Sequence, residues 1–216
     1  MNRKHLSVAL VVLLLAFVPA DSAVTKYAAD AAHSNVGFSI PILGGLSSVS
    51  GKFTDFTIEI VYDDRDVTKS TVNAVIKAAS IDTGIERRDA HLRNADFFDV
   101  EKFPEITFRS SRVEKKGKGF VAHGTFTMHG VSKEIALPFV INGVRKDEKT
   151  GKTTLGATAR TSVNRNDYGV SFSRPDNPTF LADMVDIALN VITRAASPAG
   201  APPAPAPAAA ATPRAQ

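Results

Sequence analysis

The chain has 216 residues and a formal net charge of +4, and 44% of its residues are hydrophobic. A charge so near to neutral, with mostly scattered basic residues, argues against nucleic-acid binding. The tight basic cluster from Lys115 to Lys118 is typical of a solvated turn between two strands. The chain contains no cysteine, so its stability must come from a large hydrophobic core rather than from disulfides.

The N-terminus has the pattern of an export signal. Arg3 and Lys4 precede an apolar run over residues 6–18, and Val18-Pro19-Ala20 supplies the small residues that a signal peptidase reads. The run is shorter than the ~20 apolar residues that a membrane-spanning helix needs. We therefore expect a signal peptide over residues 1–20, cleavage after Ala20, and a periplasmic protein with a net charge of +2.

Residues 21–194 form one predicted domain, and residues 195–216 form an Ala/Pro-rich tail. The tail holds six of the 12 prolines and almost no charge. Such a composition cannot pack a core, so we expect a disordered end. A spacer near an envelope surface is the alternative.

Apolar residues alternate in two-residue steps through most of the domain, which is typical of strands buried on one face. Eight such sets are present: Val36, Phe38, Ile40; Phe56, Ile58, Ile60; Val72, Ala74, Ile76, Ala78; Ile106, Phe108; Phe120, Ala122, Gly124, Phe126, Met128; Ile135, Leu137, Phe139, Ile141; Leu155, Ala157, Ala159; and Val185, Ile187, Leu189, Val191.

Gly and Asn/Asp clusters separate many of these sets, as in Asp63-Asp64 and Asn142-Gly143. This predicts antiparallel hairpins and an all-β fold. Periodicity alone leaves a sandwich and an eight-stranded barrel both open. Small inward residues such as Ala74 and Ala157 favour a barrel with unfilled space, which can hold one apolar ligand.

The alternation is interrupted between Thr83 and Phe108. Mixed apolar spacing predicts a short helical segment near residues 84–99, with Thr83 and Glu86 as a capping box. Pro104 then disfavours a helix. We interpret the segment as a lid across one end of the barrel, anchored by Leu92, Phe97 and Phe98.

Several short motifs are similar in order and spacing to those of the YceI-like proteins, also called polyisoprenoid-binding proteins. They are Ala32-His33-Ser34-x-Val36-x-Phe38, Gly51-Lys52-Phe53-x-x-Phe56, Ile81-Asp82-Thr83-Gly84, Arg88-Asp89-x-His91-Leu92, Asp96-Phe97-Phe98-Asp99-Val100, Phe103-Pro104-x-Ile106-x-Phe108, Met128-His129-Gly130-Val131-Ser132-Lys133 and Asn164-Arg165-x-Asp167-Tyr168-Gly169.

The resemblance covers residues 27–192. It implies an extended, lipocalin-like antiparallel barrel of eight strands with a helical segment, exported in Gram-negative bacteria and enclosing a long isoprenoid or similar lipid. Members of the family are often dimers. The partners that we consider are therefore a polyisoprenoid or other long apolar ligand, a second copy of the chain through an exposed strand edge, and a membrane surface touched transiently.

Strand parity predicts the residues that line the ligand cavity, although core faces and pocket faces share one pattern. The predicted apolar ligand-binding residues are Val36, Phe38, Phe56, Ile76, Phe108, Phe126, Leu137 and Leu189.

Arg88, His91 and Arg165, with Arg93, are the predicted contacts of a diphosphate headgroup at the barrel mouth. The alternative is a structural network in which Arg165 and Asp167 tie the helical segment to the barrel.

The sequence contains no compact metal-ligand motif and no cofactor motif. The candidate metal ligands match no such motif in their spacing: they are His33, His91, His129, Asp89 and Asp96. A Gly-x-Ser-x-Gly elbow and a phosphate loop are also absent, so we do not expect an enzyme, a metal site or a cofactor.

Two hypotheses for the function remain. The first is a periplasmic carrier or store for a polyisoprenoid such as a quinone or a prenyl phosphate. The second is a structural or stress-response interaction module with a filled barrel core, which binds a protein through its tail or its helical segment.

Overall fold

The computed structural model describes residues 24–195, so the predicted signal peptide and nearly all of the Ala/Pro-rich tail lie outside the described residues. Within residues 24–195, no helix is long and apolar enough to cross a membrane. The strands are β1 (Val24–Ala29), β2 (Asn35–Ile42), β3 (Ser47–Phe53), β4 (Phe56–Asp63), β5 (Thr71–Lys77), β6 (Ile81–Asp82), β7 (Glu105–Lys116), β8 (Gly119–Met128), β9 (Val131–Lys146), β10 (Thr153–Asn164) and β11 (Met184–Ala195).

The helical elements are short. They are α1 (Glu86–Arg93) and the 3₁₀ turns η1 (Ala31–His33), η2 (Leu43–Gly45), η3 (Val67–Lys69), η4 (Ala78–Ser80) and η5 (Arg165–Tyr168).

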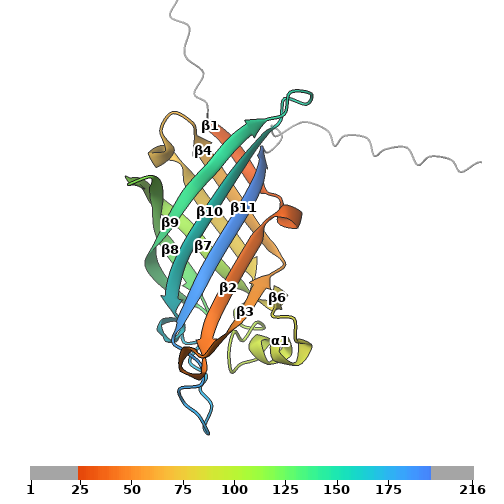
Figure 1. Ribbon diagram of the computed structural model, residues 1–216, viewed down its shortest axis with the longest axis vertical. Coiled ribbons are helices and arrows are strands. Elements are labelled where there is room, and N and C mark those ends of the chain that lie inside the picture. Colours follow the sequence, from red (N-terminus) through yellow and green to blue (C-terminus); the bar gives the residue numbers. More distant parts are fainter. Residues whose placement is uncertain (1–23, 196–216) are drawn as a thin grey trace, which may run out of the picture.

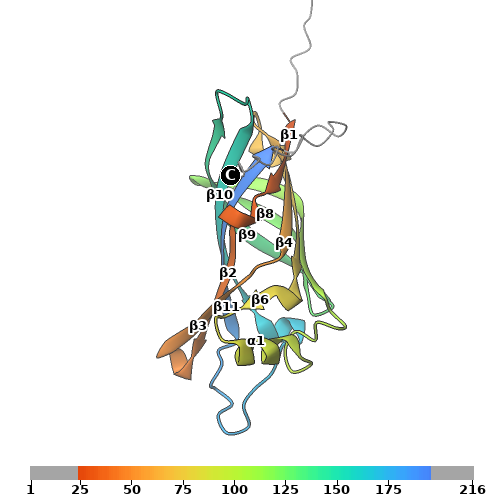
Figure 2. The same cartoon turned by 90° about the vertical axis from the view of Figure 1, so that its right-hand side faces the viewer.

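The strands form one antiparallel sheet that closes on itself as an eight-stranded barrel (Figure 1). The closed ring runs β1-β4-β5-β7-β8-β9-β10-β11, and β1 pairs with β11 to complete it. Below that seam β11 pairs with β2 instead, and β3 and β6 continue the sheet outward from β2. Figure 2 shows β3 leaning away from the barrel wall at the end where α1 lies.

The all-β barrel expected from the sequence is confirmed, and each of the eight alternating sets lies on a strand, apart from Ala78, which begins the turn η4. The alternation did not predict β1, β3 or β6. β3 is a Ser- and Gly-rich strand whose inward face includes Gly51, over which the Phe38 ring packs, and β6 has only two residues. Such segments carry too few apolar side chains to show a period.

The predicted helical segment is present, but the predicted capping box is wrong. Ile85 occupies the N-cap position, and its side chain makes no capping hydrogen bond. Thr83 instead donates its backbone N–H to Asp89 Oδ1 at 2.9 Å, and its hydroxyl donates to the same oxygen. Asp89 is buried within the helix and holds the Thr83 loop against it through these two hydrogen bonds.

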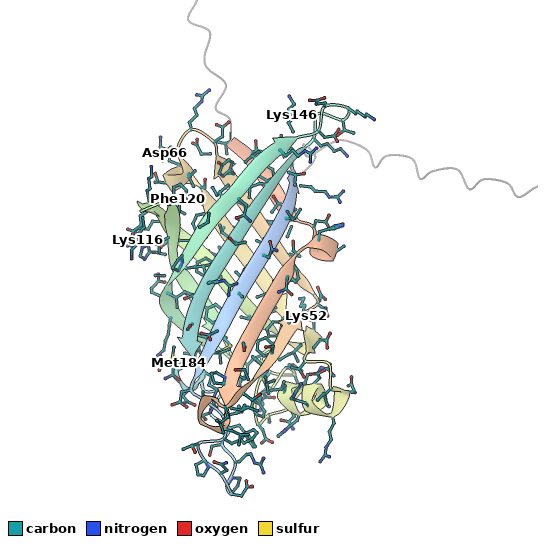
Figure 3. The ribbon with its side chains drawn as sticks, in the orientation of Figure 1. Lys52, Asp66, Lys116, Phe120, Lys146 and Met184 are labelled. Atoms are coloured by element: carbon teal, nitrogen blue, oxygen red, sulfur yellow. The ribbon has the colours of Figure 1, made fainter. Side chains whose placement is uncertain are left out.

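The main hydrophobic core lies inside the barrel and continues under α1, while a smaller cluster of Tyr27, Tyr62 and Leu155 lies near the β1 seam. The outer face is polar, with many charged side chains around the β7–β8 and β9–β10 turns (Figure 3). The strands therefore present an apolar face inward and a polar face outward, as the alternation predicts.

Gly124 tests how tightly the barrel wall is built. It faces a β-bulge in β7, and a Cβ there would contact the Arg109 carbonyl oxygen and lie 2.7 Å from Ser110 Cα. Because both obstacles are backbone, Gly124→Ala should lower the free energy of unfolding by about 1–3 kcal/mol. In Gly156→Ala the nearest atom is at 3.5 Å, so this control should unfold like the parent. Equal midpoints of urea unfolding for the two variants would contradict this account.

Candidate functional site: an apolar cavity along the barrel

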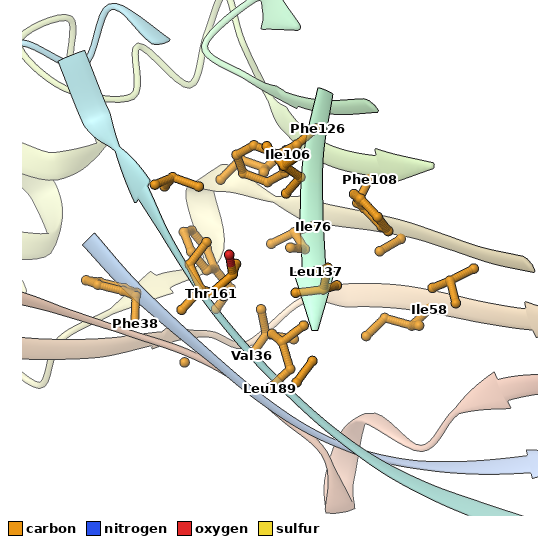
Figure 4. A pocket seen from close by; sticks show the side chains of 18 of the residues that line it. Val36, Phe38, Ile58, Ile76, Ile106, Phe108, Phe126, Leu137, Thr161 and Leu189 are labelled. Carbon is orange, nitrogen blue, oxygen red and sulfur yellow. The ribbon is translucent and has the colours of Figure 1, made fainter. Parts of the chain in front are cut away.

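An apolar cavity of about 240 Å³ runs inside the barrel. Side chains from β2, every ring strand except β1, and the α1 segment line it, and Figure 4 shows them converging from several strands. Its wall is apolar apart from four residues: Tyr62, Ser70, Thr161 and Arg165. Such a wall offers a ligand mainly dispersion contacts and release of water from apolar surface.

Most of the apolar residues predicted from strand parity lie in this wall. They are Val36, Phe38, Ile76, Phe108, Phe126, Leu137 and Leu189. Phe56 is the exception, because it packs into the buried core and does not line the cavity. Contact of these residues with a ligand stays a prediction.

The volume of the cavity comes from small inward residues, as the sequence indicates. Ala74, Ala122, Ala157 and Ala159 line it at positions where larger side chains would reach across the barrel. Gly124 serves a different purpose, since the backbone of β7 comes close to it.

The segment after β6 closes one end of the cavity. Leu92, Phe97 and Phe98 line that end, which lies at the bottom of Figure 1 beside α1. Phe98 packs edge-on to Phe53 at 6.0 Å between ring centroids, which attaches the segment to β3. The anchoring residues expected from the sequence therefore lie where a lid would need them.

The stretch between η5 and β11 also covers this end, although no periodic pattern predicts a role for it. Val170 and Leu181 line the cavity, and the Phe172 ring packs in a tilted arrangement on Phe97 at 4.7 Å between centroids. Leu181 forms an isolated bridge to Ile42 of β2. Pro175 and Pro178 interrupt any strand pattern here, so only the isolated apolar residues signalled a buried role.

The predicted headgroup residues near α1 are occupied by the protein itself. Arg88 donates from Nε to Thr83 Oγ1 at 2.7 Å and from Nη2 to the Thr83 carbonyl at 2.8 Å. His91 Nε2 lies 2.9 Å from Asp96 Oδ2, and its ring packs against Phe97. Neither Arg88 nor His91 lines the cavity. This arrangement favours the structural network over a headgroup clasp.

Arg165 holds the loop before β11 in place. Its side chain is 5% exposed and lines the cavity end. It donates to the carbonyls of Val170 at 2.7 Å, Phe172 at 3.0 Å and Ala182 at 3.0 Å. Burial lowers the pKa of the guanidinium, opposed by Asp183 3.8 Å away. Arginine nevertheless stays charged in proteins.

The sequence analysis offers a network in which Arg165 and Asp167 tie the helical segment to the barrel, but both residues bind other partners. The network exists, but Arg165 uses backbone carbonyls and Asp183, while Asp167 pairs with Lys133 at 3.3 Å. Side chains on adjacent turn positions point in different directions, and spacing alone does not assign their partners.

At the other end of the cavity Tyr62 packs edge-on against Tyr27 at 6.3 Å between centroids. Burial and the nearby Asp64 raise the pKa of Tyr62. Tyr27 donates from its hydroxyl to Thr153 Oγ1 at 3.2 Å, which links β1 to β10 beside the seam.

The three histidines considered as metal ligands lie in separate places. His33 pairs with Asp30, His91 with Asp96, and His129 Nδ1 lies 3.1 Å from the Tyr168 carbonyl. Within residues 24–195, no group of three or more His, Asp or Glu side chains is placed to hold a metal ion.

The fold and the cavity agree with a comparison of the sequence with protein families. The model of the YceI-like domain matches residues 27–193. The chain belongs to the YceI-like family. A UPF0312 protein of Shewanella sp. (strain ANA-3) is 36% identical over 158 residues, which cover 73% of this chain and 82% of that protein. A UPF0312 protein of Photorhabdus laumondii is 40% identical over 115 residues, 53% of this chain and 59% of that protein.

Solved structures show the same barrel. The YceI protein of Campylobacter jejuni is 30% identical, with a TM-score of 0.64 over 70% of this chain and 88% of that chain. A domain from Saccharophagus degradans, described as a polyisoprenoid-binding domain implicated in plant cell wall breakdown, is 16% identical. Its TM-score is 0.54 over 80% of this chain and 99% of that chain. The described residues therefore adopt the YceI-like barrel fold, with an apolar cavity inside it.

Arg165 supplies a second test. Arg165→Met keeps the length of the side chain but leaves buried carbonyls without donors, so it should lower the free energy of unfolding by about 3–5 kcal/mol. Lys133→Met removes an ion pair between half-exposed groups and should cost less than about 1 kcal/mol. Urea unfolding of both variants measures the difference. If Arg165→Met lowers the free energy of unfolding no more than Lys133→Met does, the loop before β11 does not depend on Arg165.

Proposed function

We propose that the protein is a periplasmic binding protein that encloses a long-chain polyisoprenoid, such as a quinone or a prenyl phosphate, for carriage or storage. One observation carries the proposal: the interior of the barrel holds an apolar cavity of about 240 Å³ rather than a filled core. An empty apolar cavity destabilises a protein, whereas a matching apolar ligand removes that cost.

The chemistry of the wall suits a long tail. Each methylene-sized unit that leaves water contributes roughly 0.8 kcal/mol, so affinity grows with tail length and needs few polar contacts. Phe38, Phe108 and Phe126 are placed around the cavity, and their rings give a broad contact surface (Figure 4). Selection among tails therefore rests on length and width.

The family supports this reading, since the Saccharophagus degradans domain of the same fold is described as polyisoprenoid-binding. The cavity favours a carrier over a scaffold with a filled core. A non-enzymatic role fits a wall whose polar groups are few and include an Arg165 already held by backbone carbonyls. A role in stress response, a homodimer and transient contact with a membrane surface remain predictions.

The proposed location rests on the N-terminal sequence. Export through a signal peptide predicts that the mature chain begins at Asp21. N-terminal sequencing of the protein from a periplasmic fraction tests this. Recovery of an intact Met1 end from the cytoplasm would contradict export.

Filling the cavity should abolish ligand binding. Ala74 lines the cavity on β5, while the adjacent Asn73 is exposed on the other face of the strand. Ala74→Phe should weaken binding of a C20 isoprenoid alcohol at least tenfold, because its ring takes up space that the tail needs. Asn73→Phe adds the same ring outside and should bind like the parent. Both variants are titrated with geranylgeraniol, a C20 isoprenoid alcohol. Equal affinities of the two variants would show that the isoprenoid tail does not bind in the cavity.

Removing the ligand should destabilise the protein. At ~24 cal/mol per Å³, an unfilled cavity of about 240 Å³ costs up to roughly 6 kcal/mol. Protein purified from its own envelope should release an apolar molecule on lipid extraction, seen by mass spectrometry, and should melt at a lower temperature afterwards. Repeated recovery of empty protein whose melting temperature does not respond to added isoprenoid would refute the proposal.

A further inference from the structure

The turn between β2 and β3 carries apolar side chains that the fold does not bury. Leu46 is 88% exposed and Leu43 is 45% exposed, and Gly44 and Gly45 lie between them. A Cβ built on either glycine would meet no atom within 4 Å, so residues 24–195 leave the turn open on that side. Figure 2 shows this end of the β2–β3 hairpin projecting sideways from the barrel.

The backbone of the turn is strained at Leu43. Its φ is +54°, in the left-handed region that suits Gly and Asn and is costly for leucine. The turn is nevertheless held in place, because Leu43 donates its backbone N–H to the Phe180 carbonyl at 2.9 Å. An exposed leucine in a conformation that suits asparagine better adds nothing to the stability of the fold. Its side chain therefore points to a role in contact with another phase or molecule.

The hairpin that carries this turn is free of charge. No Asp, Glu, Lys, Arg or His occurs from Ser34 to Gly51, although 22% of the residues in the chain are charged. A charged side chain would be costly at the hydrocarbon boundary of a bilayer, whereas exposed leucines are stabilised there. The charge pattern of the hairpin thus matches a bilayer surface.

The size of the turn favours a bilayer over a protein partner. A standard protein interface takes ~800 Å² from each partner, and four residues on a projecting turn expose far less than that. A bilayer surface needs no matching shape. The free edge of β3 limits the depth of insertion. β6 pairs only with Lys52 and Phe53, so within residues 24–195 the outer edge of β3 before Lys52 has no strand partner and must stay hydrated.

We propose that the turn Leu43–Leu46 docks the protein on a lipid bilayer by inserting its two leucines into the bilayer surface. The inference rests on the proposed function and deepens it, because a carrier of a tail that water excludes must meet the bilayer that holds the tail. Phe38 and Ile40 of the same hairpin line the cavity, so docking by the turn brings the cavity close to the membrane. Because the contact is apolar, it does not require anionic lipid.

Two single-tryptophan variants test the contact, since the chain has no tryptophan of its own. Leu46→Trp places the indole in the turn, and Val140→Trp places it at a 48% exposed position on β9. The chain that begins at Asp21 is used, so that the predicted signal peptide cannot bind the vesicles. Phosphatidylcholine vesicles should shift the emission of Leu46→Trp to shorter wavelength, in low and high salt alike, and leave that of Val140→Trp unchanged. No shift, or an equal shift in both variants, overturns the inference.

Removing the two leucines should abolish docking without harm to the fold. Leu43→Asn with Leu46→Ser should weaken vesicle binding by about tenfold or more. Its melting temperature should hold or rise, because Asn adopts the left-handed backbone more readily than Leu. The matched control is Val140→Ser with Val144→Ser, which removes two other side chains of 48% and 47% exposure and should bind vesicles like the parent. An equal loss in both double variants would contradict a contact through the turn.

Titration with geranylgeraniol separates this inference from the proposed function. Leu43→Asn with Leu46→Ser should bind the dissolved alcohol like the parent. A parent that binds geranylgeraniol but no vesicles overturns the docking surface alone. A parent that binds vesicles through the turn but not geranylgeraniol refutes the proposed function while supporting the bilayer contact. An emission shift of Leu46→Trp that follows protein concentration without vesicles would identify a second copy as the occupant of the turn and overturn the inference.

Discussion

The pairing of β1 with β11 is the constraint on which the rest of the molecule depends. Only Tyr27 to Ala29 of β1 face Thr193 to Ala195 of β11, yet this short ladder converts a sheet with two edges into a barrel. Thr193 is fully buried at the seam and donates its hydroxyl to the Leu155 carbonyl at 3.1 Å. Without closure the inner face would have to be covered by another layer, and no enclosed apolar space would form.

The seam is reinforced where β1 gives way to β2. Asp30 donates its backbone N–H to the Ile192 carbonyl at 2.8 Å, and its carboxylate accepts from Arg194 Nε at 2.9 Å. Ser34 Oγ both donates to the Ile192 carbonyl and accepts from the Ile192 N–H. Side chains thus replace the ladder for a few residues, which lets β11 change partner without exposing its backbone.

Much of the fold was predictable because the inner and outer faces differ so clearly in polarity. The two-residue alternation of apolar side chains also predicted most of the cavity wall. A cavity inside a barrel is lined by the same inward-facing residues that would otherwise form its core. Phe56 shows the limit, because periodicity assigns a face but not a depth along the axis. Hydrophobic periodicity also could not predict the hydrogen-bond partners of Thr83 and Arg165. Hydrogen bonds in loops depend on the positions of backbone atoms, which the spacing of apolar residues does not determine.

Alternation along each strand also separates the residues that shape the cavity from those that form the outer surface. Residues such as Ala74 and Ala157 set the bore of the barrel, while their neighbours Asn73 and Thr158 face outward. A substitution at an inward position can change the shape of the cavity and leave the outer surface unchanged. The cavity and the outer surface can therefore diverge independently, by point changes one residue apart.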